Sequence, residues 1–65
     1  MELRDLCAFA TLGELLHFGQ AAERMHVTQS ALSKQIQRLE GEFGGALFER
    51  SPSGTRLTPL GRALH

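Results

Sequence analysis

The sequence lacks tryptophan and tyrosine and has a single cysteine, Cys7, among its 65 residues. One cysteine excludes an internal disulfide bond and fits a reducing compartment. The sequence also lacks an apolar run near the roughly 20 residues that cross a bilayer, and its N-terminus lacks the basic and apolar regions of an export signal. These absences predict a cytoplasmic protein with no membrane partner.

Net charge is absent as well, because seven Lys/Arg balance seven Asp/Glu. Neutrality by itself argues against a strongly basic nucleic-acid binder. The two halves differ, however. Residues 1–27 have two arginines against four acidic residues and a net charge of −2, whereas residues 28–65 have five basic against three acidic residues and a net charge of +2. This asymmetry indicates that the second half faces an anion.

Patterns for catalysis or metal binding are missing too. The soft and imidazole ligands, Cys7, His17, His26 and His65, have no close zinc-type spacing. No G-x-S-x-G or comparable catalytic motif is present, and 65 residues form one modest core without a deep pocket. We therefore expect neither an enzyme nor a protein with a metal or cofactor.

Apolar periodicity predicts two helices in the first half of the chain. The first helix covers about residues 3–16, and the following residues are expected on its buried face: Leu6, Phe9, Ala10, Gly13 and Leu16. Leu12 and Leu15 fall off that face, so they are expected to be exposed or to meet a partner. A shorter second helix places Phe18, Ala21, Ala22 and Met25 at helical spacing.

A third helix follows Thr28, whose hydroxyl suits the N-cap position. Its apolar stripe is expected to comprise Leu32, Ile36, Leu39 and Phe43, and its end is marked by Gly44. The opposite face is polar, with Ser30, Ser33, Lys34, Gln37 and Arg38. From periodicity alone, this face is as well explained by contact with solvent as by contact with a ligand.

Two short extended runs, residues 47–50 and 55–57, then flank the turn-forming residues 51–54, which predicts a β-hairpin. Thr58 followed by Pro59 marks the start of a fourth helix. The whole pattern predicts a mainly α fold, a three-helix winged helix-turn-helix with a short hairpin wing. In such a unit the third helix of this chain lies in the DNA major groove, with its N-terminal residues on base edges.

The stretch "FGQAAERMHVTQSALSKQIQRLEGEFGGALFERSPSGTRLTPLG" resembles the N-terminal DNA-binding domain of LysR-type transcriptional regulators, and "MELRDLCAFATLGEL" resembles that domain's first helix. The resemblance implies a DNA-binding domain over residues 1–58, with the helix-turn-helix at about 18–37 and the wing at about 47–57. Residues 59–65 would begin a linker helix, and the effector-binding domain of the family lies outside the sequence.

The resemblance also implies a set of DNA-binding residues. Those on the third helix are Thr28, Gln29, Ser30, Ser33, Lys34 and Gln37, and those flanking the wing are Arg50 and Arg56. Arg38 joins them either as a phosphate contact or as an i+4 partner of Glu42. The chain departs from the family pattern at two of these positions, Ser30, where the family usually has proline, and Lys34, where it usually has arginine. Lysine lacks the planar fork that arginine uses for bidentate guanine recognition.

The partners that the resemblance implies are double-stranded DNA, a second copy of the chain through the linker helix, and a small-molecule inducer through the absent domain. Two other interpretations stay open at this point. The chain could be a winged helix that binds protein, which its neutral charge favours, or a winged-helix regulator of another family.

Overall fold

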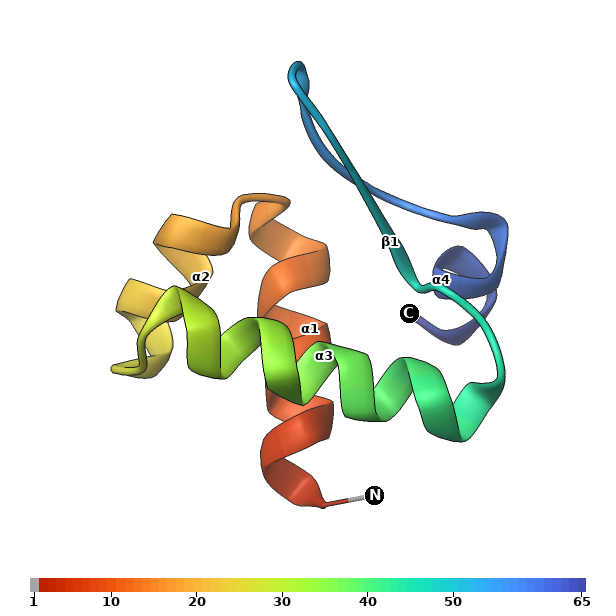
Figure 1. Ribbon diagram of the computed structural model, residues 1–65, viewed down its shortest axis with the longest axis horizontal. Helices are drawn as coiled ribbons and strands as arrows, with labels where there is room; N and C mark the ends of the chain where they lie inside the picture. The colour runs from red at the N-terminus through yellow and green to blue at the C-terminus, as the bar shows by residue number, and fades with distance from the viewer. Residues whose placement is uncertain (1) are drawn as a thin grey trace.

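Four helices and one antiparallel hairpin make up the chain, which the computed structural model describes over residues 2–65 (Figure 1). In order, they are α1 (Leu3–Leu15), α2 (Phe18–Met25), α3 (Gln29–Phe43), β1 (Phe48–Ser51), β2 (Gly54–Leu57) and α4 (Pro59–Leu64). The predicted mainly α winged helix-turn-helix is confirmed, and each strand begins and ends within one residue of the range expected from the sequence.

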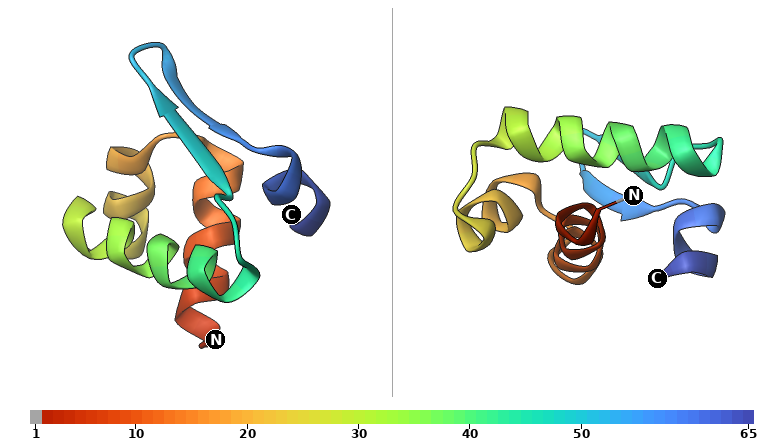
Figure 2. Two further views of the ribbon diagram at one scale, coloured as in Figure 1. Left: turned by 45° about the vertical axis from the view of Figure 1, so that its right-hand side comes forward. Right: turned by 90° about the horizontal axis from the view of Figure 1, so that it is seen from below.

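The helix α3 runs across α1, with α2 at its N-terminal end and α4 beside its C-terminal end (Figure 1). In the view from below, α1 is seen nearly end-on beneath α3 (Figure 2). The hairpin projects away from the helices, and its tip lies at the end of the molecule opposite the start of α1. One face of α3 is therefore covered by α1 and α2, while another face is left open.

The covered face of α3 forms the centre of the core. Leu32 and Leu39 are fully buried and Ile36 is 3% exposed, as the stripe predicted. Phe43, the fourth member of that stripe, is wrongly predicted, because it is 39% exposed. The helix ends directly after it at Gly44, in the left-handed conformation, and the chain turns back to bury Leu47 in the core instead.

The buried face of α1 differs from the expected one. Its buried residues are Asp5, Ala8, Phe9 and Leu12, and Leu15 packs partly buried against the same core. Leu6 is 43% exposed, and Leu16, at 37%, lies beyond the helix end as its left-handed C-cap. The prediction failed because it left Asp5 out of the apolar pattern, although Asp5 heads the true i, i+3, i+4, i+7 face.

Asp5 is buried because both of its carboxylate oxygens have partners. Oδ1 accepts a hydrogen bond from Arg38 Nη2 on α3 at 3.1 Å, and Oδ2 accepts one from the backbone N–H of Glu2 at 3.5 Å, within a capping box. The side chain of Asp5 is 4% exposed and that of Arg38 is 63% exposed. This ion pair joins the start of α1 to the middle of α3.

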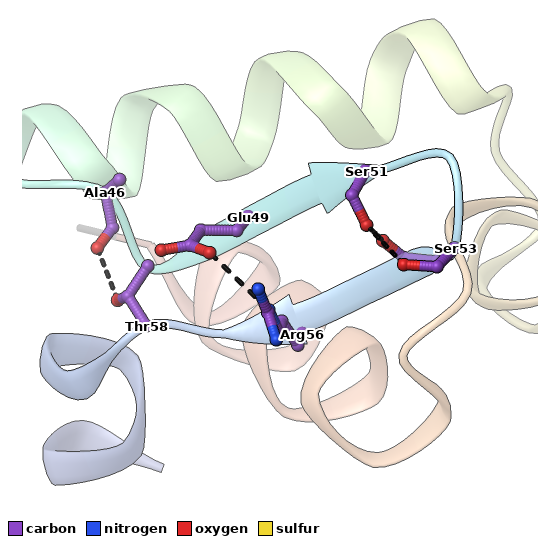
Figure 3. A network of polar contacts seen from close by, with 7 residues as sticks. Ala46, Glu49, Ser51, Ser53, Arg56 and Thr58 are labelled. Atoms are coloured by element: carbon purple, nitrogen blue, oxygen red, sulfur yellow. Dashed lines mark hydrogen bonds and ion pairs between the residues drawn. The ribbon is translucent and has the colours of Figure 1, made fainter.

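Threonine caps begin two of the helices, as the sequence predicted. Thr28 Oγ1 accepts from the N–H of Ala31 at 3.1 Å, and Thr58 Oγ1 accepts from the N–H of Gly61 at 3.0 Å. Thr58 also donates to the carbonyl of Ala46 at 2.6 Å, across the base of the hairpin (Figure 3). The second cap thus closes the hairpin and starts α4 together.

A carboxylate ties the hairpin to α3. Glu40 Oε2 accepts from the backbone N–H groups of Leu47 at 2.8 Å and of Phe48 at 3.4 Å, just where β1 begins. The strands pair from Phe48 with Leu57 to Ser51 with Gly54. At the tip Ser51 Oγ donates to the carbonyl of Gly54, and its oxygen lies 2.9 Å from Ser53 Oγ (Figure 3). The bonds to Glu40 therefore fix the position of the start of β1 relative to α3.

Two glycines within helices give a matched test of the packing. A Cβ at Gly61 would collide with the backbone carbonyl of Leu47, whereas a Cβ at Gly41 would meet nothing within 4 Å. We expect Gly61→Ala to lower the free energy of unfolding by about 1–3 kcal/mol through overpacking. Gly41→Ala should raise it by about 0.5–1 kcal/mol through helix propensity. Urea unfolding followed by circular dichroism measures both, and a Gly61→Ala variant as stable as the wild type or more stable would contradict the close approach of α4 to Leu47.

The pair between Asp5 and Arg38 is tested by a double-mutant cycle with Asp5→Asn and Arg38→Gln. Since one partner is buried, we expect a coupling free energy of about 1–2 kcal/mol, with solvent at Arg38 keeping it below that of a fully buried pair. The control cycle is Glu14→Gln with Arg24→Gln, an exposed pair 3.8 Å apart, which should couple by about 0.5 kcal/mol or less. Equal coupling in the two cycles would show that burial of Asp5 adds nothing.

Candidate nucleic-acid interface

The exposed face of α3 and one residue of β1 together line a shallow depression. Its lining residues are Gln29, Ser30, Ser33, Lys34, Gln37 and Arg50. All six belong to the set that the sequence analysis selected. The first five lie within nine residues of one another on the helix, whereas Arg50 reaches the depression because the chain turns back after Gly44.

Arg50 connects the hairpin to both helices of the helix-turn-helix. Its Nη2 donates to Ser33 Oγ at 3.1 Å, and its Cζ lies 3.4 Å from the centroid of the Phe18 ring. The second contact is a cation–π interaction, since the guanidinium stands over the ring face. The position of Arg50 at the edge of the wing is predictable from the sequence, but neither partner is, because both contacts depend on how the hairpin folds back.

Arg56 lies on the second strand, opposite Glu49 in the register of the hairpin. Its Nε is 3.5 Å from Glu49 Oε2, and the two side chains are 72% and 55% exposed (Figure 3). An exposed pair of this kind is worth about 1 kcal/mol or less. Arg56 can therefore exchange Glu49 for an external anion at little cost.

Arg38 and Thr28 lie at the margins of the depression and do not line it. Arg38 is bound to Asp5 of α1, a partner that the sequence could not indicate because 33 residues separate the two. Thr28 is exposed, but its oxygen accepts the capping hydrogen bond of α3. Both residues thus have structural roles: the cap of Thr28 was predicted from the sequence, whereas the bond of Arg38 to Asp5 was not.

Lys34 is an exposed cation that lines the depression beside Arg50. Within residues 2–65 it takes part in no ion pair, whereas Arg24, Arg38 and Arg56 each have an acidic partner. Across the same part of the chain, no cluster of three or more His, Cys, Asp or Glu side chains is placed to hold a metal ion. The arrangement is suited to hydrogen bonding and to attraction of an anion.

None of the helices described between residues 2 and 65 combines the length and the apolar character needed to span a membrane.

Comparison with known proteins gives consistent results. The sequence model of the family described as "Bacterial regulatory helix-turn-helix protein, lysR family" matches residues 3–62. The regulator IlvY of Escherichia coli is 50% identical over 64 residues, which cover 98% of this chain and 22% of IlvY. The regulator TfdT of Cupriavidus pinatubonensis is 47% identical over 62 residues, covering 95% of this chain and 27% of TfdT. The chain thus spans about a quarter of the length of these curated relatives.

Solved structures of similar proteins share the fold closely. Full-length OxyR C199D from Pseudomonas aeruginosa superposes with a TM-score of 0.90 at 48% identity, covering 98% of this chain and 21% of OxyR. The DNA-binding domain of CbnR, solved as a DNA complex, superposes with a TM-score of 0.91 at 41% identity, covering 98% of this chain and 74% of that one. With the matching family model, these likenesses show that the chain belongs to the LysR family of bacterial regulatory helix-turn-helix proteins.

Proposed function

We propose that the chain is the sequence-specific DNA-binding domain of a transcriptional regulator, with α3 in the major groove and the hairpin on the flanking backbone or minor groove. The observation that supports this best is the gathering of six polar and cationic side chains from α3 and β1 around one open depression. The CbnR and BenM domains, whose structures are DNA complexes, have the same fold with a TM-score of 0.91 each.

The residues divide by the chemistry of their side chains. Gln29 and Gln37 can pair bidentately with adenine, and Ser30 and Ser33 can bond to base edges or phosphates. Lys34 can bond to guanine or neutralise a phosphate, but as a point charge and not as a planar fork. We propose that these five side chains, with Thr28 at the helix start, address the bases and the adjacent backbone.

The remaining cations surround this surface. Arg50 and Arg56 would bring positive charge to the DNA backbone from the wing, and Arg38 would do so from the α1 side through the part of its guanidinium that Asp5 leaves exposed. The domain would act without catalysis or a cofactor, in the cytoplasm where a bacterium keeps its DNA. Sensing of a small-molecule inducer would belong to a domain outside this sequence.

A salt titration separates this proposal from a winged helix that binds protein. Three or four phosphate contacts per domain predict that log K falls with log[salt] with a slope of about −3 to −4, since each contact contributes about −0.9. The measurement is fluorescence anisotropy with a labelled 30-bp duplex of mixed sequence, beginning at low salt. Lys34→Gln should make the slope shallower by about one if Lys34 contacts phosphate, and should relax base preference if it contacts guanine.

The matched control is Arg62→Gln, which removes a charge from α4 at a position outside the depression and should leave the slope unchanged. No retention of DNA even at low salt would contradict the proposal and favour a protein partner.

We further propose that the intact regulator is a homodimer through a continuation of α4. A second depression, between α1 and α4, is mostly apolar and includes Leu6, Phe9 and Leu64, of which Leu6 and Leu64 are 43% and 40% exposed. A dimer would place two copies of α3 on half-sites about one helical turn or a multiple apart.

Sedimentation equilibrium tests the dimer. We expect the 65 residues to be monomeric at micromolar concentration, because six residues of α4 bury too little surface for a stable interface, and a version extended by the encoded continuation to dimerise. A dimeric 65-residue chain would show that the main dimer element already lies within α1 and the present part of α4.

A further inference from the structure

Phe18, Ser33 and Arg50 form a cluster drawn from three different elements, α2, α3 and β1. The guanidinium of Arg50 is stacked on the Phe18 ring and donates to Ser33 Oγ at 3.1 Å, so it is held on two sides. Ser33 is half-buried and, together with Arg50, lines the depression that contains Gln29 and Lys34. Arg50, a residue of the wing, therefore lines the depression and is hydrogen-bonded to one of the α3 side chains that line it.

The hydrogen bond fixes the chemical character of that serine. A guanidinium has only donors, so Ser33 Oγ must be the acceptor. One lone pair of the hydroxyl is then engaged, and the adjacent positive charge polarises the O–H bond. One lone pair remains, but the strengthened O–H donor biases Ser33 toward donation, whereas an unrestrained serine would donate or accept equally well.

The position of Arg50 is itself restrained by the hairpin. Glu40, seven residues after Ser33 on α3, accepts from the N–H groups of Leu47 and Phe48, and the side chain of Arg50 follows two residues later along β1. The strand is thus attached to α3 at two points, about two helical turns apart. Arg50 cannot leave Ser33 by a movement of the whole wing without breaking the bonds at Glu40.

We propose that Arg50 is a positioning residue that determines base specificity by making Ser33 a donor, an inference that rests on the DNA-binding function proposed above. A donor selects a base with a major-groove acceptor, such as a purine N7, guanine O6 or thymine O4, and disfavours the N4 amino group of cytosine. This role is separate from the charge that Arg50 brings to the backbone. A pure phosphate contact would be replaced adequately by lysine and would weaken all sequences equally.

The test begins with selection of duplexes from a randomised 30-bp pool by the wild-type chain and by Ser33→Ala. The position at which Ser33→Ala loses preference marks the base that Ser33 reads. The preference is then the ratio of Kd for the duplex with cytosine at that position to Kd for the selected duplex. We expect roughly tenfold for the wild type, within the usual range for one mismatched base pair.

Arg50→Lys keeps the charge and a donor but loses the planar group that is held between the Phe18 ring and Ser33 Oγ. Without that placement the bond to Ser33 is lost, so the ratio should fall below about twofold with an unchanged salt slope. Phe18→Leu removes the ring while leaving the arginine, and it should also lower the ratio.

The double variant of Ser33→Ala and Arg50→Lys should behave as Ser33→Ala alone. Arg62→Lys is the control and should keep the wild-type ratio. Circular dichroism confirms that each variant is folded.

Retention of the tenfold ratio in both Arg50→Lys and Phe18→Leu would overturn the positioning role while leaving the DNA-binding function intact. A Ser33→Ala chain that loses preference at no position would overturn it as well, as would a wild-type preference for cytosine there. By contrast, failure of the wild type to select any sequence would count against the proposed function itself.

Discussion

The structure depends on burial of a single stripe of α3. A chain of 65 residues has room for one core, so the helix that presents the polar surface must also be the helix around which the other elements pack. Leu32 and Leu39 have no exposed surface, and α1, α2 and the residues that enter β1 lie against this side. Because these contacts fix the rotation of α3 about its axis, they also decide which of its side chains face outward.

Charged groups at the two margins of α3 complete this arrangement. On one margin Arg38 reaches down to the buried carboxylate of Asp5 on α1, and on the other Arg50 reaches back from β1 to Ser33. Glu40 adds the attachment of the hairpin base. The helix α3 and the hairpin are therefore held in one fixed arrangement. This preorganisation lowers the entropic cost of ordering side chains and loops when a ligand binds.

The features that could be predicted from the sequence are those whose causes are local. Thr28 and Thr58 cap the next turn of their own helices, and spacing alone predicts three of the four residues placed in the α3 stripe, although not the exposure of Phe43. The buried face of α1 was wrongly predicted because its first member, Asp5, is a charged residue that no apolar pattern includes. Asp5 is buried because it pairs with Arg38, 33 residues away. Likewise, the candidate residues on α3 could be predicted as one polar helix face. The contact between Ser33 and Arg50 could not, because it depends on the tertiary fold.

The same contacts explain how a chain without net charge can present a cationic surface. Two acidic side chains have internal partners, since Asp5 pairs with Arg38 and Glu40 accepts from the backbone N–H group of Leu47. Lys34, Arg50 and Arg56 lie on or beside that face and determine the local field, which governs attraction of a polyanion more than the total does. Three or four cations still supply limited affinity, and the remainder has to come from fixed hydrogen-bond geometry. Under the role proposed for Ser33, a half-buried serine on α3 would supply part of that geometry.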